Sequence, residues 1–442
     1  MAGVLGNINK SYVSSINFLD QREILNKVLD ITNEEISFLD IMELTNRSNP
    51  TSVPVFNHFV NEELYVLGTV SAVTGSGVTG TTSAPPSVTA TIDSTAFAYV
   101  NVGELVMFPD GKVGYITSKA ATTNIVVKSV DGSTLTLASG DKVSFFSNAA
   151  GEGSLSPDAK KWGVTKYDNQ VQIFKGKFSI TDVQKASKVE VEFQGKPFYM
   201  YKGQHESLMK FRGDISTALM FGRKSSTLFA DASPALTDAE GKPVQTTGGL
   251  DQIVTSRGIN QSLLTAGTAT LADIQTLTQT LNKARCPQEY FLFVGTTMNI
   301  ALDNLFNNLG NSALLSQGAR FQIAGKELEL GIDTVKIYGR TYHKKYLPLL
   351  DHQNIVNYTG SPNFKNSAYG APAGKIKTND GQMLDRLGVR YMAGDGTDLK
   401  YREILLGGLA PVPTNERSVL EIHYESVQGL EVLGANQFFK LS

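Results

Sequence analysis

The sequence predicts an α+β protein that carries a small all-β domain inserted between two distant parts of the chain. Three observations lead to this prediction. One long amphipathic helix is expected from Pro197 to about Phe221, because apolar residues recur there every three or four positions. Short alternating segments separated by Asp-Gly turns fill 88–147. Gly- and Ser-rich stretches flank those segments on both sides, as expected of an insertion.

The composition is that of an ordinary globular protein. The chain has 442 residues, enough for two or three domains with their own cores. Its 42 acidic and 40 basic residues give a net charge of −2, and no basic run is present, which argues against tight binding to phosphate backbones. Cys286 is the only cysteine, which excludes an intrachain disulfide. With no signal-peptide pattern and no apolar run of about 20 residues, we expect synthesis and use in a cytoplasm.

Residues 1–52 are predicted to form an N-terminal arm with short helices. The apolar residues of the first helix have helical spacing: Ile24, Leu25, Val28 and Leu29. A second helix is expected from Thr32, where Glu35 completes a capping box. Helices this short are not stable alone in water. The arm is therefore expected to lie on a surface of this chain or of another.

A long hairpin is predicted to carry the inserted domain. Its first limb begins with an alternating, aromatic-rich strand at 53–67, and its return limb contains a β-like run at 166–180. Between them, five short strands predict a small barrel or sandwich. They are expected at 96–108, 112–117, 124–130, 133–138 and 142–147.

A dinucleotide-binding loop is one reading of Gly75-Ser-Gly77-Val-Thr-Gly80, which matches that fingerprint in form. Such a site needs a helix N-terminus directly after the glycines, and here Pro85 and Pro86 follow instead. We interpret the segment as a flexible hinge.

The long helix presents one apolar stripe, formed by Leu208, Phe211, Ile215, Leu219 and Gly222. Gly203 and Gly213 lie inside it and mark either a close approach of another backbone or a bend. After it, helices from Thr270 and Thr296 with a strand at 289–294 between them predict a layered α/β region. Further strands are expected at 320–323, 327–330, 334–338, 401–409, 418–424 and 430–440.

No pattern of catalytic or metal-ligating residues stands out. The histidines share no metal-ligand spacing, and the motifs of common nucleophiles and phosphate loops are absent. Cys286 is interpreted as a buried structural thiol and Asp395–Asp398 as a turn. Tyr342–Tyr346 is read as a solvated strand end, and contact with nucleic acid is the less favoured alternative. We therefore expect no catalytic residue, cofactor or metal site. A structural role is favoured over the alternative, an α/β enzyme with an accessory barrel.

Several short sequence segments, taken in order along the chain, resemble segments of one protein family. They are Asn148–Ser154, Val171–Thr181, Gly248–Asp251, Glu289–Gly295 and the ending at 430–442. With the arm before them and the long helix among them, the chain resembles the major capsid proteins of tailed bacteriophages (Caudoviricetes) with the Hong Kong 97-type fold. The resemblance covers about 1–72 and 148–442. Its ending is most similar to capsid proteins of crAss-like phages of gut Bacteroidales.

The resemblance implies a division of the chain into named parts. They are an N-terminal arm (1–52), the first limb of an extended loop (53–74), an inserted β-barrel-like domain (75–150), the return limb (151–182), a peripheral domain with the spine helix (183–254), an axial domain (255–395) and the C-terminal strands of the peripheral domain (396–442).

It also implies a function and partners. The chain would self-assemble into hexamers and pentamers of an icosahedral shell around double-stranded DNA, with portal, scaffold and decoration or auxiliary capsid proteins of the same phage as further partners. It would be made in the bacterial cytoplasm and reside in the virion capsid. An encapsulin-like compartment shell and a phage tail or baseplate protein are the alternatives. The residues expected to contact other subunits are Ile24, Leu25, Val28, Leu29, Val55, Phe56, Phe59, Phe174 and Phe178.

Overall fold

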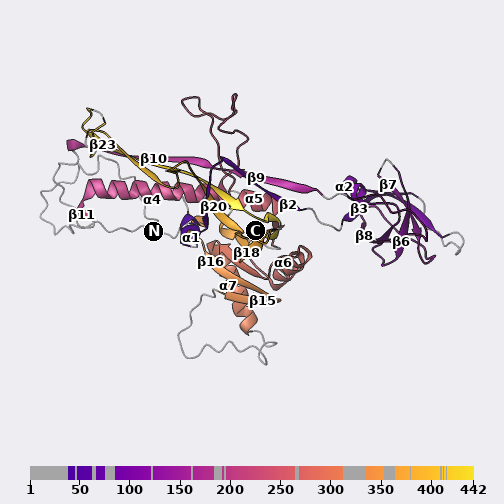
Figure 1. Ribbon diagram of the computed structural model, residues 1–442. Helices are drawn as coiled ribbons and strands as arrows, with labels where there is room; N and C mark the ends of the chain where they lie inside the picture. The colour runs from indigo at the N-terminus through magenta and orange to yellow at the C-terminus, as the bar shows by residue number, and fades with distance from the viewer. Residues whose placement is uncertain are drawn as a thin grey trace. The chain divides into compact units, whose positions relative to one another are not determined.

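A computed structural model describes most of the chain. The described residues are 38–44, 47–61, 66–74, 85–120, 123–160, 163–183, 192–193, 196–263, 268–311, 334–352, 364–378, 380–408, 411, 413–414 and 416–442. They fold into two compact units, one made of residues up to Phe56 and from Asp168 onward, the other of Asn57–Tyr167 (Figure 1). No helix among the described residues is both long and apolar enough to cross a membrane. The helix expected at Ile24–Leu29, the Gly75–Gly80 segment and the strands expected at 320–330 lie outside these residues.

The first unit contains the long helix α4 (Phe198–Phe221), which confirms the range that the apolar stripe predicts. Phe211, Ile215 and Leu219 of the stripe are buried, and α4 lies alongside β10 and β23 (Figure 1). An ideal Cβ built on Gly203 would lie 2.7 Å from the ring of Phe178, whereas one on Gly213 would meet nothing within 4 Å. Gly203 therefore marks a close approach of β10 to an unbroken helix.

The sheet that α4 covers has the order β1-β20-β23-β10, with β21 paired to β20 and β22 to β23. Its strands are β1 (Ser48–Thr51), β10 (Gln172–Thr181), β20 (Leu387–Gly394), β21 (Thr397–Asp398), β22 (Arg402–Leu406) and β23 (Val419–Val432). β23 is one strand of 14 residues, so the prediction of separate strands at 418–424 and 430–440 is wrong. Its second half is buried on both faces, which removes the alternation by which a strand is recognised.

A second sheet in the same unit has the order β13-β24-β17-β14-β16-β15. Its strands are β13 (Ile259–Gln261), β14 (Glu289–Val294), β15 (Thr334–Ile337), β16 (Arg340–Tyr346), β17 (Ala368–Pro372) and β24 (Phe439–Leu441). The helices that accompany it are α6 (Leu271–Lys283) and α7 (Thr296–Asn311). Thr270 caps α6 in a capping box with Asp273, as the sequence predicts.

The two sheets exchange strands across the predicted boundary at 395. β20 lies within the region 255–395 that the resemblance assigns to the axial domain, yet it pairs with β23 and β1 in the first sheet. β24 was expected with the C-terminal strands, yet it pairs with β13 and β17 in the second. Sequence order does not reveal such an exchange, because each strand has an ordinary apolar pattern by itself.

Short elements complete the first unit. They are α1 (Phe38–Leu44), α5 (Leu250–Arg257), the hairpins β11 (Glu192–Phe193) with β12 (Lys196–Pro197) and β18 (Lys375–Lys377) with β19 (Met383–Asp385), and the 3-10 turns η1 (Pro348–Leu350), η2 (Phe364–Asn366) and η3 (Ala435–Gln437). The turn predicted at Asp395 is confirmed, with positive φ at Asp395 and Gly396 between β20 and β21.

The second unit is a closed six-stranded barrel with the order β3-β4-β7-β6-β5-β8. Its elements are β3 (Leu67–Thr74), β4 (Ser87–Ile92), α2 (Ser94–Tyr99), β5 (Glu104–Met107), β6 (Val113–Lys119), β7 (Asn124–Ser129) and β8 (Lys142–Asn148). A two-stranded ribbon, β2 (Val55–Asn61) paired with β9 (Val164–Gln170), leads into and out of it (Figure 1).

The inserted barrel is confirmed, and three details differ from the prediction. It begins at Leu67 rather than 75, because the Ser- and Thr-rich run that looked like a linker supplies β3. Residues 96–99 belong to α2, which Asp93 caps by accepting a hydrogen bond from the amide of Ala96 at 2.9 Å. Residues 133–138 form no strand, although Leu135 among them is buried in the barrel core.

We expect the barrel to fold without the rest of the chain. Every member of its core lies between Val66 and Phe145, and the core includes no residue of the first unit. A fragment of residues 66–160 should therefore unfold cooperatively by itself. The chain with 62–163 replaced by a short Gly-rich linker should keep α4. Circular dichroism and thermal unfolding measure both, and loss of the helical signal in the shortened chain would contradict the expectation.

Candidate functional site: a buried polar junction

The return limb changes its pairing partner at one point, which sequence reasoning missed. The run expected as one strand at 166–180 is two strands, because β9 ends at Gln170 and β10 begins at Gln172. β9 pairs with β2, whereas β10 pairs with β23. Between them, the amide of Val171 donates to the carbonyl of Pro54 at 3.0 Å. The backbone groups around this change of partner need other hydrogen bonds, since none may stay buried and unpaired.

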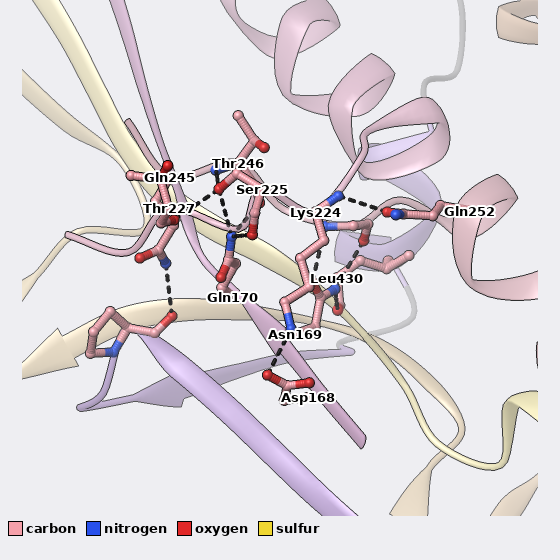
Figure 2. Close-up of polar contacts among 12 residues, drawn as sticks. Asp168, Asn169, Gln170, Lys224, Ser225, Thr227, Gln245, Thr246, Gln252 and Leu430 are labelled. Carbon is pink, nitrogen blue, oxygen red and sulfur yellow. Dashed lines mark hydrogen bonds and ion pairs between the residues drawn. The ribbon is translucent and has the colours of Figure 1, made fainter. Parts of the chain in front are cut away.

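Asn169 supplies three of these hydrogen bonds (Figure 2). Its Nδ2 donates to the carbonyls of Gly248 at 2.9 Å and Leu430 at 2.7 Å, and its Oδ1 accepts from the amide of Gly248 at 2.9 Å. The side chain is 6% exposed. One buried amide thus joins β9 to the segment after α4 and to β23.

Two glutamines extend the same network. Nε2 of Gln170 lies 2.8 Å from the carbonyl of Thr246 and 2.9 Å from Oγ of Ser225 (Figure 2). Nε2 of Gln245 donates to the carbonyls of Val171 at 2.9 Å and Pro54 at 3.2 Å. Both side chains are buried. We call Asn169, Gln170, Ser225, Gln245 and Thr246, with the backbone groups they bind, the polar junction.

Glycines allow the backbones of the junction to approach this closely. An ideal Cβ built on Gly249 would lie 2.6 Å from the amide nitrogen of Gly222, and one on Gly429 would lie 2.5 Å from the carbonyl oxygen of Gln170. Real Cβ atoms do not tolerate such distances. The glycine at position 249 of the segment Gly248-Gly-Leu-Asp is therefore explained by the close packing between the end of α4 and the start of α5.

Lys224 holds the exposed rim of the junction. Its amide donates to Oε1 of Gln252 at 2.7 Å, and its Nζ lies 2.7 Å from the carboxylate of Asp168 (Figure 2). This ion pair is partly exposed, so it contributes at most about 1 kcal/mol. The buried amides, and not the rim charges, fix the end of α4 to β9.

A buried carboxylate joins α5 to the second sheet. Oδ1 of Asp251 accepts from the hydroxyl of Tyr369 on β17 at 2.8 Å and from Nζ of Lys440 on β24 at 2.7 Å. Arg223 lies 3.3 Å from its other oxygen. Burial, and then the charge of Asp251, raises the pKa of the Tyr369 hydroxyl.

The polar junction is built for holding strands in place and offers no set of reacting groups. Its members are amides and hydroxyls without a nucleophile and base pair. Among the residues that the structure describes, no three His, Cys, Asp or Glu side chains gather as metal ligands. Burial raises the pKa of the Cys286 thiol, which lies against Tyr290 and Arg340. A thiol kept protonated in this way is a poor nucleophile.

Comparison with known families decides the class of protein. The SU10 major capsid protein family matches residues 8–338, which is more than half of the chain. The chain belongs to the SU10 major capsid protein family. It is a structural protein that forms the icosahedral shell of a tailed phage and resides in the virion capsid. The interpretation as a capsid protein rather than an α/β enzyme or a tail protein is thereby confirmed.

Solved structures show weaker likenesses. The chain is 13% identical to a chain in the capsid of Cyanophage P-SCSP1u, with 67% of this chain and 79% of that chain covered and a TM-score of 0.37. For Microbacterium phage Oxtober96 the identity is 10%, the coverage 99% of each chain and the TM-score 0.42. For the SrpI encapsulin of Synechococcus elongatus PCC 7942 the identity is 8%, the coverage 64% and 77%, and the TM-score 0.34. TM-scores this low do not establish a shared fold. No curated protein matches the chain.

The residues expected to contact neighbouring subunits of the capsid protein divide into three groups. Phe59 is 62% exposed on the ribbon, and Val55 and Phe56 are half-buried at its base. Phe174 is 7% exposed in the core of the first unit, and Phe178 packs on α4 opposite Gly203. These two are used inside the subunit, because they lie on the face of β10 that α4 covers. The remaining four, at 24–29, lie outside the described residues.

We expect Asn169→Ala to destabilise the subunit strongly. The change leaves one amide and two carbonyl groups buried without partners, at a cost of about 2–4 kcal/mol. Urea unfolding of the unassembled subunit measures this loss. Asp168→Ala is the matched control on the same strand, and it should cost under about 1 kcal/mol because its ion pair is exposed. Equal effects of the two variants would show that the junction does not carry the stability.

Alkaline pH should unfold the subunit through its buried tyrosines. Burial raises the pKa of Tyr290, Tyr342, Tyr369 and Tyr424, which are all 5% exposed or less. The folded state therefore favours the neutral phenols. This contribution to stability is complete below about pH 10, the pKa of an unfolded tyrosine, and is lost as pH rises further.

Tyr369→Phe tests one of these groups. It removes the hydrogen bond to the carboxylate of Asp251 at a cost of about 1.5–3 kcal/mol near neutral pH, and it should make stability fall less steeply above about pH 10. Denaturant unfolding at a series of pH values checks both effects. Tyr338→Phe, at a side chain that is 50% exposed, is the control and should leave the profile unchanged. A Tyr369→Phe profile as steep as that of the unmodified chain would contradict the assignment.

Proposed function

We propose that this capsid protein builds its shell from hexamers and pentamers with the Hong Kong 97-type arrangement, around double-stranded DNA. The main support for the proposal is the order in which the structural parts follow one another along this chain, which belongs to a capsid protein family. A docked arm, a ribbon that carries a barrel, a long helix and two sheets follow one another as in that arrangement. We interpret the ribbon as the extended loop and α4 as the spine.

The ribbon supports a contact with neighbouring subunits. Within the described residues, β2 and β9 form a sheet of two strands. A two-stranded ribbon is marginally stable in water by itself, so a contact along it would stabilise it. Phe59 and Val164 add exposed apolar surface, at 62% and 56% exposure. A neighbouring subunit would cover these side chains, at about 25 cal/mol per Å² of apolar area.

The described end of the arm is fixed to its own subunit. Phe38, Leu39 and Met42 of α1 are buried against the core that α4 lines, and Glu43 pairs with Arg212 of α4 at 2.9 Å. β1 then joins β20 in parallel. The part of the arm proposed to reach neighbours is therefore 1–37, with Ile24, Leu25, Val28 and Leu29 as contact residues.

The near-neutral charge of the chain supports the proposal of a shell that encloses DNA without binding it in a sequence-specific way. The net charge of −2 gives little attraction to phosphate, since tight binding needs clustered Lys and Arg. We propose portal, scaffold and decoration or auxiliary capsid proteins of the same phage as the other partners. We also propose that the phage is crAss-like, because the segment 430–442 is most similar to capsid proteins of crAss-like phages.

Deleting residues 1–37 should separate folding from assembly. The deletion spares α1, so the subunit should keep its unfolding midpoint while electron microscopy finds no shells. Deleting 1–44 is the matched comparison. It also removes Phe38, Leu39 and Met42 from the core, at about 2–5 kcal/mol each, and should prevent stable folding.

Normal shells from the 1–37 deletion would refute the role of the arm. Stable folding after deletion of 1–44 would refute the anchoring role of α1.

A further inference from the structure

The second sheet has one face that its own helices cover and one that they do not. Tyr290, Leu292 and Tyr342 point toward α6 and α7 and belong to one core cluster with them. Side chains alternate along a strand, so Phe291 and Phe293 of β14 point the other way. Phe293 is 4% exposed and belongs to the core that α4 lines, whereas Phe291 is 37% exposed. The cover on this second face therefore ends between the two phenylalanines.

β16 extends the uncovered part of this face. Phe293 pairs with Lys345 and Phe291 with His343 in the parallel ladder, which places all four side chains on one side. The rings of Phe291 and His343 are in contact, with centroids 5.4 Å apart. Lys345 is exposed and His343 is partly exposed. We call Phe291, His343 and Lys345 the open face.

The first described residue of the arm lies at the edge of the open face. Phe38 of α1 is fully buried and packs edge-on against Phe293, with ring centroids 5.7 Å apart. On the other side of β14, the partners of its two phenylalanines are already covered, since Tyr369 is 1% and Ala371 4% exposed. A chain that stays on the sheet before Phe38 must therefore cross the open face.

The open face carries a positive charge that its own strands do not balance. In the described part of the chain no ion pair involves Lys345, whereas its neighbour Lys344 pairs with Asp303 on the opposite side of the sheet. Nε2 of His343 lies 2.7 Å from a carboxylate oxygen of Glu289. A carboxylate that lies on this face would therefore find its counter-charge at Lys345.

The segment before Phe38 has matching chemistry and length. Residues 30–37 contain three acidic residues and no basic residue. In the second helix that the sequence predicts for the arm, Glu34 lies four residues before Phe38 and thus on the same side of the helix. One helical turn advances about 5.4 Å, close to the about 4.8 Å between neighbouring strands. With Phe38 on Phe293, Glu34 therefore reaches the strand that holds Lys345.

We propose that the arm crosses the open face of its own subunit before it leaves for a neighbour, and that Glu34 pairs there with Lys345. The helical turn before Phe38 also covers part of Phe291. This inference rests on the proposed role of the arm, and it adds the route by which the arm leaves the subunit. The contact is small, so it directs the arm and does not hold the fold together.

Carbodiimide cross-linking of unassembled subunits tests the pair. The reagent activates a carboxylate, and the amine of a contacting lysine displaces the activating group, which leaves as a urea while an amide forms. With ¹⁵N-labelled and unlabelled subunits mixed, we expect an amide between Glu34 and Lys345 within one chain. Lys224 and Asp168, 2.7 Å apart, are the internal positive control. No amide from Lys345 to the arm, or an amide only between chains, would overturn the proposal.

Two matched variants identify the carboxylate. Glu34→Gln should abolish the cross-link to Lys345. Glu35→Gln is the control on the adjacent residue, and it should keep the cross-link, because glutamine also serves in the capping box that the sequence predicts there. An equal yield from both variants, or loss in Glu35→Gln alone, would overturn the assignment to Glu34.

Hydrogen exchange measures the pair without a reagent. Lys345→Glu should speed amide exchange at 32–37 by roughly two- to fivefold, the range expected of a partly exposed ion pair. Combining it with Glu34→Lys should restore slow exchange, since the two charges are then exchanged. Lys242→Glu, on an exposed loop, is the control and should change nothing. Unchanged exchange in Lys345→Glu, or no recovery in the combined variant, would count against the pair.

The route of the arm and its role in the shell fail separately. All these measurements use unassembled subunits, so their results do not depend on shell formation. If the cross-link is absent and shells still require the arm, the route is refuted and the proposed function stands. If the cross-link forms and shells assemble without 1–37, the route stands and the role of the arm between subunits is refuted.

Discussion

Buried backbone groups must be hydrogen-bonded, and the rest of this structure depends on how that requirement is met where β9 becomes β10. A strand that leaves one partner for another loses its ladder for a residue or two. Here Asn169, Gln170 and Gln245 replace the missing ladder with side-chain amides. The same amides hold the segment that follows α4 and the C-terminal part of β23. The helix, the sheet and the root of the ribbon therefore share one set of hydrogen bonds.

This arrangement explains how a subunit can carry a two-stranded ribbon and a barrel without losing its own fold. The polar junction lies entirely in the first unit, and the barrel core lies entirely in the second. Between them, β2 and β9 add little stability of their own. A capsid protein gains from this division, since the parts proposed to meet neighbours are not the parts that hold the subunit together.

The sequence predicts the elements with strong local signals and fails where the decisive contacts are distant. The apolar stripe of α4, the capping box at Thr270 and the Asp110-Gly111 turn between β5 and β6 are local, and all are confirmed. The break at Val171 depends on Gln245, which lies far along the chain. Its only sequence signal is the polar run Asp168-Asn-Gln170 inside a β-like segment. Phe174 and Phe178 were assigned to subunit contacts because the sequence does not show which face of β10 the helix covers.

The exchange of strands between the two sheets affects the order in which the chain folds during synthesis. β23 lies between β10 and β20 and also pairs with β22, and β24 lies between β13 and β17. Neither sheet can close until residues 419–441 have left the ribosome. Until then, β10 lacks its partner β23 and β17 lacks its partner β24. Strands without their partners make nascent chains prone to aggregation. Contacts between residues so far apart also fold slowly. A newly made subunit thus cannot complete either sheet, or the surfaces that the two sheets support, before these strands are available.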